Sequence, residues 1–300
     1  MTTNPTFKLL DRTVASFILL ALVVLLPIAA WFLPPIASWI ASAFLLLIFM
    51  LTLGLAITGR VSGILINEQN VFSLARLQAV VWTIIILSAY IVSVTVRIRH
   101  CADAPLDIGI DQNLWAVMGI SVTSLIGSPL IAATKYSKNP DPTETVKTAK
   151  ALVATGNTPA TQTDATTSTT PAAELKSQQV QDTIDTIHQS RQGTLYANPT
   201  LADATFSDLF EGDEIGNAAQ IDLGKLQMFF FTVVIALAYC LSLASTFWTI
   251  KDGDSNPISQ FPVLSQGMLA LLGISHAGFL LNKGVDHTKQ PDGSMITAKQ

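Results

Sequence analysis

Residues Leu77–Val96 read LQAVVWTIIILSAYIVSVTV, twenty consecutive positions without a charged side chain. A helix needs about 20 predominantly apolar residues to cross the hydrocarbon core of a bilayer. Five further stretches of similar length and apolarity lie at Val14–Leu33, Ile36–Ile57, Leu114–Ala133, Leu226–Trp248 and Phe261–Leu281. The sequence therefore predicts an all-α integral membrane protein with six transmembrane helices, surrounded by the lipid bilayer.

The composition argues against a soluble domain and against several kinds of site. Only 13% of the 300 residues are charged, about half the share in average globular proteins. Two cysteines, Cys101 and Cys240, are too few for a disulfide scaffold or a cysteine-based metal centre. A formal net charge of −4 offers no basic surface for nucleic acid. The sequence also lacks phosphate-binding and dinucleotide motifs, so we expect no metal, no cofactor, no nucleic-acid partner and no enzymatic activity.

Lysine and arginine positions predict the orientation of the spans, because cytoplasmic loops are enriched in these residues. With the N-terminus inside, only Arg97, Arg99 and Lys251 fall outside, which leaves 14 of the 17 basic residues on the inner side. We therefore expect a protein of the plasma or inner membrane with both termini in the cytoplasm.

The third and fifth spans resemble each other position by position, and so do the fourth and sixth. The pairs are, at an offset of 149 residues, Arg76 and Lys225, Gln78 and Gln227, Thr83 and Thr232, Tyr90 and Tyr239, and, at an offset of 154, Gly119 and Gly273, and Ser121 and Ser275. Both copies enter the membrane from the same side, which implies a pseudo-twofold axis along the membrane normal. The sequence thus predicts an N-terminal hairpin followed by two parallel copies of a two-helix hairpin.

This duplication divides the chain into five expected segments. They are the N-terminal hairpin (1–58), the first copy (59–136), an insert (137–205), the second copy (206–283) and a cytoplasmic tail (284–300). Just before the fifth span, Asp222 is suited to cap the N-terminus of that helix.

The insert between the copies differs from the rest of the chain. Residues 143–170 contain eleven threonines, and no aromatic residue lies between Tyr136 and Tyr196. Such a segment buries too little apolar area to offset the entropy of ordering it, so we expect a mostly disordered, flexible cytoplasmic tether. Within it, Val180, Ile184 and Ile187 recur at helical spacing and predict an amphipathic helix over 174–191.

An apolar knot follows the insert, formed by Phe206, Leu209 and Phe210 among acidic residues. One interpretation is a docking element for a partner protein or a neighbouring subunit. The other is that the knot and the amphipathic helix pack against the chain's own cytoplasmic helix ends, which is the commoner fate of such segments.

Polar residues inside the spans also allow two interpretations. They could line a path along the pseudo-twofold axis, or they could form hydrogen bonds between helices. The set comprises Arg76, Gln78, Thr83, Tyr90, Ser121, Lys225, Gln227, Thr232, Tyr239, Ser275 and His276. Gly119, Thr123 and Gly127 recur at every fourth position of the fourth span, a spacing that lets helices approach closely.

Two functions follow as expectations. The first is a homo-oligomeric passive channel or pore for ions or small solutes, because a symmetric pair of polar stripes on an axis suits a pore. The alternative is a structural membrane anchor or scaffold that recruits a cytoplasmic protein partner through residues 137–225. A coupled transporter ranks third, because no span carries a buried carboxylate.

Overall fold

The computed structural model describes residues 11–156, 172–250 and 258–291. Within these residues the fold is helical, with isolated β-bridges in place of strands. Five helices are long and apolar enough to cross a membrane. They are α1 (Arg12–Phe32), α2 (Pro35–Thr58), α3 (Leu74–Arg99), α4 (Gln112–Ala133) and α7 (Leu223–Thr249). The expected all-helical fold is therefore confirmed, with five candidate membrane spans among the described residues.

The last apolar stretch forms a shorter helix than expected, α8 (Gln266–Gly284). It begins five residues after Phe261, where the Ser265 hydroxyl accepts a hydrogen bond from the backbone N–H of Met268 at 3.2 Å. Pro262 lies in the segment before it and lacks the N–H that a helix or ladder would use. At 19 residues, α8 is not among the five candidate spans.

Contacts between residues divide the chain into two compact units. The first, called here the bundle, comprises Met1–Leu65, Leu74–Leu125 and Gln227–Ala277. The second, called here the polar unit, comprises Ile66–Ser73, Ile126–Leu226 and Gly278–Gln300.

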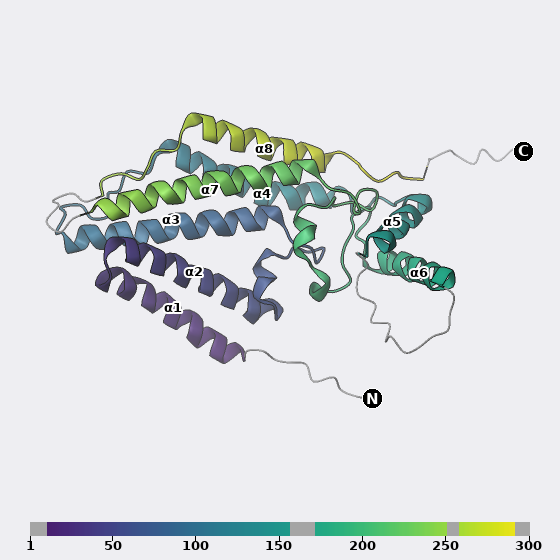
Figure 1. Ribbon diagram of the computed structural model, residues 1–300, viewed down its shortest axis with the longest axis horizontal. Helices are drawn as coiled ribbons and strands as arrows, with labels where there is room; N and C mark the ends of the chain where they lie inside the picture. Colours follow the sequence, from purple (N-terminus) through teal and green to yellow (C-terminus); the bar gives the residue numbers. More distant parts are fainter. Residues whose placement is uncertain (1–10, 157–171, 251–257, 292–300) are drawn as a thin grey trace, which may run out of the picture. The chain divides into compact units, whose positions relative to one another are not determined.

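In the bundle, α1 and α2 form a hairpin and run side by side (Figure 1). Leu33 and Pro34 separate the two helices, and Pro35 occupies the first position of α2, where a missing N–H costs nothing. The hydroxyl of Ser38 lies 3.0–3.3 Å from the carbonyl oxygens of Ala29, Ala30 and Leu33. The single hydroxyl proton can be donated to one of these carbonyls at the end of α1 at a time, and this bond helps to fix the turn.

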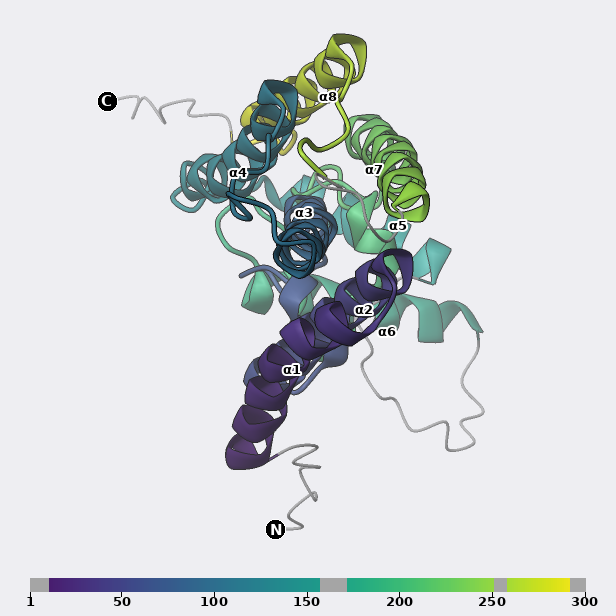
Figure 2. The same ribbon diagram turned by 90° about the vertical axis from the view of Figure 1, so that its left-hand side faces the viewer.

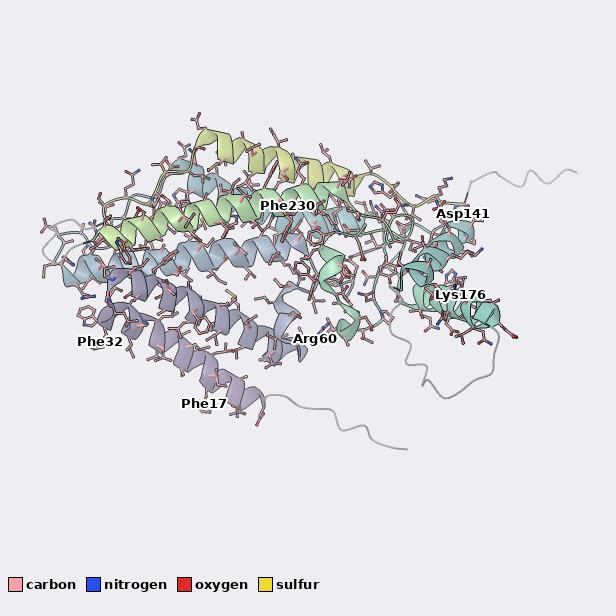
Figure 3. The ribbon with its side chains drawn as sticks, viewed as in Figure 1. Phe17, Phe32, Arg60, Asp141, Lys176 and Phe230 are labelled. Atoms are coloured by element: carbon pink, nitrogen blue, oxygen red, sulfur yellow. The ribbon has the colours of Figure 1, made fainter. Side chains whose placement is uncertain are left out.

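Helix α3 lies in the middle of the bundle, with α2 on one side and α4 and α7 on the other (Figure 2). Ala89 and Val92 of α3 are completely buried. The ring of Trp39 packs on Phe247 with centroids 5.7 Å apart, and Trp82 meets Tyr239 edge-on at 6.2 Å. By contrast, Phe17 and Phe32 of α1 point outward and are 68% and 78% exposed (Figure 3), which suits a lipid surrounding.

The polar unit contains α5 (Pro142–Thr155), α6 (Ala172–Ser190) and the 3₁₀ turns η2 (Leu201–Asp203) and η3 (Phe206–Leu209). The predicted amphipathic helix is confirmed as α6. Its Ile187 is buried with Leu152 of α5 and with Ile215, and Val180 and Ile184 pack against this cluster. The apolar stripe of α6 is therefore used inside the polar unit.

The prediction of a flexible tether from residue 143 is wrong over α5. The Asp141 carboxylate accepts the backbone N–H of Thr143 at 2.8 Å, Pro142 takes the first helical position, and Gly156 ends the helix at φ 73°. Ala149 and Leu152 lie on the buried face of this helix. Good caps and one apolar face outweigh the unfavourable threonine composition. Residues 157–171 of the predicted tether lie outside the described residues.

Candidate functional site

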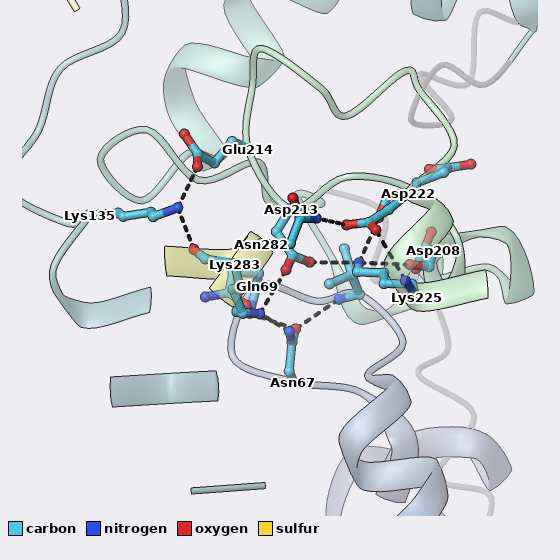
Figure 4. A network of polar contacts seen from close by, with 12 residues as sticks. Asn67, Gln69, Lys135, Asp208, Asp213, Glu214, Asp222, Lys225, Asn282 and Lys283 are labelled. Atoms are coloured by element: carbon cyan, nitrogen blue, oxygen red, sulfur yellow. Dashed lines mark hydrogen bonds and ion pairs between the residues drawn. The ribbon is translucent and has the colours of Figure 1, made fainter. Parts of the chain in front are cut away.

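An ion pair between Lys135 and Glu214 lies in the interior of the polar unit. The two side chains are only 2% and 1% exposed, and Lys135 Nζ lies 2.5 Å from Glu214 Oε1. Lys135 Nζ also donates to the backbone carbonyls of Lys283 at 2.6 Å and Val285 at 2.8 Å (Figure 4). These three acceptors use all three protons of the ammonium group.

The carboxylate of Glu214 is equally well satisfied. Its Oε1 atom also accepts the backbone N–H of His287, and Oε2 accepts that of Thr288, both at 3.0 Å. Thr288 in turn accepts the N–H of Gly216 through its hydroxyl. The segment after α8 is thus held to the loop Glu211–Asn217 by charge-assisted hydrogen bonds, which are stronger than neutral ones.

A second ionic group centres on Asp213, one residue before Glu214. Its two carboxylate oxygens each bind a lysine at 2.7 Å, Lys225 at the start of α7 and Lys283 at the end of α8. Burial alone would raise the pKa of Asp213, but the two lysines outweigh it and hold that pKa well below its usual range. The carboxylate therefore stays charged at neutral pH and links the ends of two helices.

Asp222 connects the same two helix ends. Its Oδ1 atom accepts the backbone N–H of Lys225 at 3.1 Å, which confirms the expected N-cap of α7. Its Oδ2 atom accepts Nδ2 of Asn282 in α8 at 3.0 Å (Figure 4). The cavity between these groups measures only about 10 Å³, at or below what one water needs. The charges around this cavity therefore face one another, and the cavity itself has no room for a bound molecule.

Asp208 in η3 fixes a further loop of the polar unit. Its Oδ2 atom accepts the backbone N–H groups of Phe72 and Thr205 at 3.0 and 3.1 Å, and its Oδ1 atom accepts the Thr205 hydroxyl. Burial raises the pKa of Asp208, and these hydrogen bonds offset part of that rise. Asp208 thus ties the loop before α3 to the turn that carries Phe206.

Sequence reasoning missed most of this network. In the sequence, Lys135 and Lys283 are two of the basic residues that predict the orientation of the spans, and Asp213 and Glu214 are two of the acidic residues around the apolar knot. The partners lie far apart in the sequence, and no spacing rule links them. A usable signal was the charge of Asp213 and Glu214 next to the apolar Ile215, which is fully buried.

Only some of the polar residues that the sequence predicts to face one another in the bundle are in contact in the structure. Gln78 is 1% exposed and donates from Nε2 to the Thr232 hydroxyl at 2.5 Å. The corresponding pair from the other copies, Gln227 and Thr83, is exposed, and the Thr83 hydroxyl donates to the backbone carbonyl of Ala79 within its own helix. A duplicated sequence therefore yields one interhelical hydrogen bond rather than two.

The remaining members occupy mixed positions. His276 is 3% exposed, and its Nδ1 atom lies 2.6 Å from the hydroxyl of Ser124. Ser121, Ser275 and Tyr239 are buried, whereas Tyr90 and Arg76 are half-buried in α3. Lys225 belongs to the ionic network of the polar unit.

The small residues of α4 make little contact within the described chain. Gly119 and Thr123 are exposed, and a Cβ atom at Gly119 would meet nothing within 4 Å among the residues that the structure describes. A Cβ at Gly127 would touch Leu280 at 3.5 Å, an ordinary contact. Gly127 alone therefore lies against another helix.

The apolar knot divides between interior and surface. Leu209 is 1% exposed, Phe210 is half-buried, and Phe206 is 60% exposed. The rings of Phe206 and Phe210 meet edge-on with centroids 5.6 Å apart. Of the three predicted docking residues, Phe206 therefore presents the largest apolar surface.

Comparison with models of protein families, with curated proteins and with solved structures finds no match. Across the described ranges, no three His, Cys, Asp or Glu side chains are arranged to hold a metal ion.

Proposed function

We propose that this protein is a membrane anchor or scaffold, in which the bundle fixes a folded polar unit that recruits a protein partner. The observation that carries the proposal is the ionic network of Lys135, Glu214 and Asp213. Each of these charges is satisfied by groups of the polar unit itself. Such a network favours one rigid arrangement of loops over a catalytic or transport role, in which charged groups face a ligand.

The proposed membrane topology has six crossings, with α8 as the sixth and with both termini and the polar unit in the cytoplasm. Two observations support the repeat of two-helix hairpins. Helices α3 and α7 begin at Leu74 and Leu223, 149 residues apart, and α4 and α8 begin at Gln112 and Gln266, 154 residues apart. These are the offsets of the duplicated residues, and the distribution of basic residues supports the orientation.

Phe206 is the proposed contact for the partner. It is a large apolar side chain that is 60% exposed. The turn that carries it is held in place by the buried side chain of Leu209 and by the hydrogen bonds of Asp208. A rigid aromatic side chain loses little entropy on binding and is a common anchor of protein interfaces.

The scaffold proposal is tested by comparing Phe206→Ala with Leu175→Ala in the full-length chain, purified from its own membranes. Leu175 is an exposed apolar residue of α6 in the same unit, at 46%, and serves as the matched control. We expect Phe206→Ala to lose one stoichiometric partner that the wild type and Leu175→Ala retain, with membrane insertion unchanged in all three. Equal recovery of the partner by the three chains would contradict the proposal.

A passive channel is the second candidate, favoured by a different observation. Several buried polar atoms of the bundle have no hydrogen-bond partner among the described residues: Gln78 Oε1, Trp82 Nε1, Tyr239 Oη and Ser275 Oγ. Buried polar atoms are costly unless satisfied, and internal water is the usual partner. A hydrated path past Gln78 would serve ions or small solutes in an oligomer or a single chain.

The channel candidate is tested by solute flux through liposomes that contain the purified chain. Gln78→Leu removes a buried amide, and Gln227→Leu removes the corresponding exposed amide and is the control. A channel along this path predicts that flux falls only for Gln78→Leu. Wild-type liposomes with no more flux than empty liposomes would exclude it.

A further inference from the structure

A second, larger cavity of the polar unit lies beside the start of α7. It is an open cleft of about 290 Å³, whereas the cavity within the ionic network has only about 10 Å³. Its walls include Asn217, Ile221, Asp222, Leu223, Asn282 and His287. Its size is near the lower limit for small-molecule sites, so it fits a small polar group.

The charged residues that line the cleft indicate which kind of ligand group it could bind. Asp222 is the carboxylate of the cleft, and the nearby cations Lys225 and Lys283 bind Asp213 and do not line it. Each oxygen of Asp222 accepts one hydrogen bond within the chain, from Lys225 N–H and from Asn282 Nδ2. A carboxylate has about four acceptor positions, so about two remain for a donor in the cleft.

The other polar groups of the cleft are compatible with a hydrogen-bond donor. His287 Nε2 lies 2.9 Å from the backbone carbonyl of Asn282, so in the neutral ring Nε2 carries the proton and Nδ1 is an acceptor. The amide oxygen of Asn217 accepts the backbone N–H of Glu214 at 2.9 Å and keeps one further acceptor position. The amide nitrogen of Asn282 donates to Asp222, which leaves the amide oxygen as an acceptor. One carboxylate and several neutral acceptors favour a compact cation with several protons, such as a primary ammonium group.

The edge of the cleft is apolar. Ile221 and Leu223 are 70% and 72% exposed, and Leu223 is the first residue of the candidate span Leu223–Thr249. Large apolar side chains at the beginning of a span lie where lipid chains meet headgroups, and there they are covered by acyl chains. A polar cleft next to such residues fits one end of a lipid and not a free solute.

We propose that this cleft binds the ammonium headgroup of a membrane lipid, with Asp222 as its counter-ion and with Ile221 and Leu223 against the acyl chains. The lipid class is one with a primary amine, as in phosphatidylethanolamine. The site is separate from the contact proposed for Phe206 and does not depend on the scaffold function.

The proposal is tested by the lipids that the full-length chain retains when it is released from bilayers containing equal amounts of phosphatidylethanolamine, phosphatidylcholine and phosphatidylglycerol. Native mass spectrometry counts the retained molecules. We expect phosphatidylethanolamine to be enriched about fivefold or more over the other two, the effect of one ionic contact near a protein surface. Enrichment of phosphatidylglycerol, or equal retention of all three, would overturn the proposal.

Asp222→Asn tests the counter-ion, because an asparagine oxygen still caps α7. This variant should lose the preference for phosphatidylethanolamine, and Leu223→Ser should lower the amount retained. Asp286→Asn is the matched control, since Asp286 is an acidic residue of the same unit that binds Lys138 and does not line the cleft. An unchanged preference in Asp222→Asn, or the same loss in Asp286→Asn, would contradict the assignment. The comparison of phosphatidylethanolamine with phosphatidylcholine on the wild type needs no variant, and equal retention of these two also overturns it.

Discussion

Lys135 and Glu214 lie 79 residues apart in the chain and form an ion pair of 2.5 Å whose side chains are almost completely buried. Two buried charges cost several kcal/mol each in lost solvation, and only a full set of hydrogen bonds repays this. Here the set is complete, since the ammonium has three acceptors and the carboxylate three donors. The pair therefore fixes which loops of the polar unit lie together.

Removing one partner of this ion pair should destabilise the polar unit more than removing both partners. Lys135→Met leaves the Glu214 charge buried and unpaired, and we expect a loss of about 3–5 kcal/mol in the stability of the polar unit. Lys135→Met combined with Glu214→Leu should recover most of it. Hydrogen exchange at the amides of Tyr196 and Ile215, which donate to backbone carbonyls and not to Glu214, measures the effect in the purified protein. A double variant no more stable than the single would show that the pair is not coupled.

Acid should loosen the polar unit through Asp213. Lys225 and Lys283 overcome the effect of burial and lower the pKa of this group from its unfolded value of 3.8. Its stabilising contribution is therefore complete above about pH 4 and is lost as the pH falls towards the lower folded pKa. Hydrogen exchange, corrected for its intrinsic pH dependence, should show this loss in the wild type.

The matched variants for this acid effect are Asp213→Asn and Asp208→Asn. Asp213→Asn should lower stability at pH 7 and make its decline on acidification shallower. Burial raises the pKa of Asp208, so its contribution has the opposite sign and weakens as the pH rises. Asp208→Asn should therefore retain the acid-induced loss, and a loss that disappears only in Asp208→Asn would refute this assignment.

The close approach at Gly216 predicts a strict requirement for glycine. A Cβ atom there would lie 2.2 Å from the carbonyl oxygen of His287, and backbone cannot move aside as a flexible side chain can. We expect Gly216→Ala to cost about 1–3 kcal/mol, the usual range for overpacking. Gly284→Ala, where a Cβ would meet nothing within 4 Å of the described chain, is the control. Limited proteolysis after α8 should detect loosening in Gly216→Ala and not in Gly284→Ala.

Within the bundle, the free energy of the hydrogen bond between Gln78 and Thr232 can be compared with that of the duplicated pair, Gln227 and Thr83. A double-mutant cycle of Gln78→Leu and Thr232→Val should give a coupling of about 0.5–1.5 kcal/mol, the range for such bonds in membrane proteins. The cycle of Gln227→Leu and Thr83→Val should give a coupling near zero, because both residues are exposed. Reversible unfolding in mixed micelles provides the free energies. Equal couplings would mean that the two copies pack alike.

The sequence predicts the apolar helices because a lipid-exposed helix must be apolar along its whole length. It also predicts α6, since Val180, Ile184 and Ile187 follow a helical period. The threonine-rich composition of this segment argues against helix α5. The Asp141-Pro142 pair, by contrast, is a helix start signal, and it predicts α5 correctly. Local patterns therefore predict helices well when the stripe or the caps are read residue by residue.

The candidate site was the less predictable part. Lys135, Glu214 and Lys283 come from three distant points of the chain. The sequence alone does not distinguish a buried lysine from an exposed one. The duplication was also an incomplete guide, because Gln78 pairs with Thr232 while Gln227 remains exposed. Which copy of a repeated residue is buried depends on neighbours outside the repeat, and hydropathy does not contain that information.

A photo-crosslinking amino acid at position 206 of the full-length chain, in its own membranes, reports which protein lies against this position. The same amino acid at position 175, an exposed apolar site of α6, serves as the reference. If the polar unit recruits a protein through Phe206, irradiation gives one discrete adduct with another protein from position 206 and none from position 175. No adduct at 206, or the same adducts from both positions, would contradict the scaffold function.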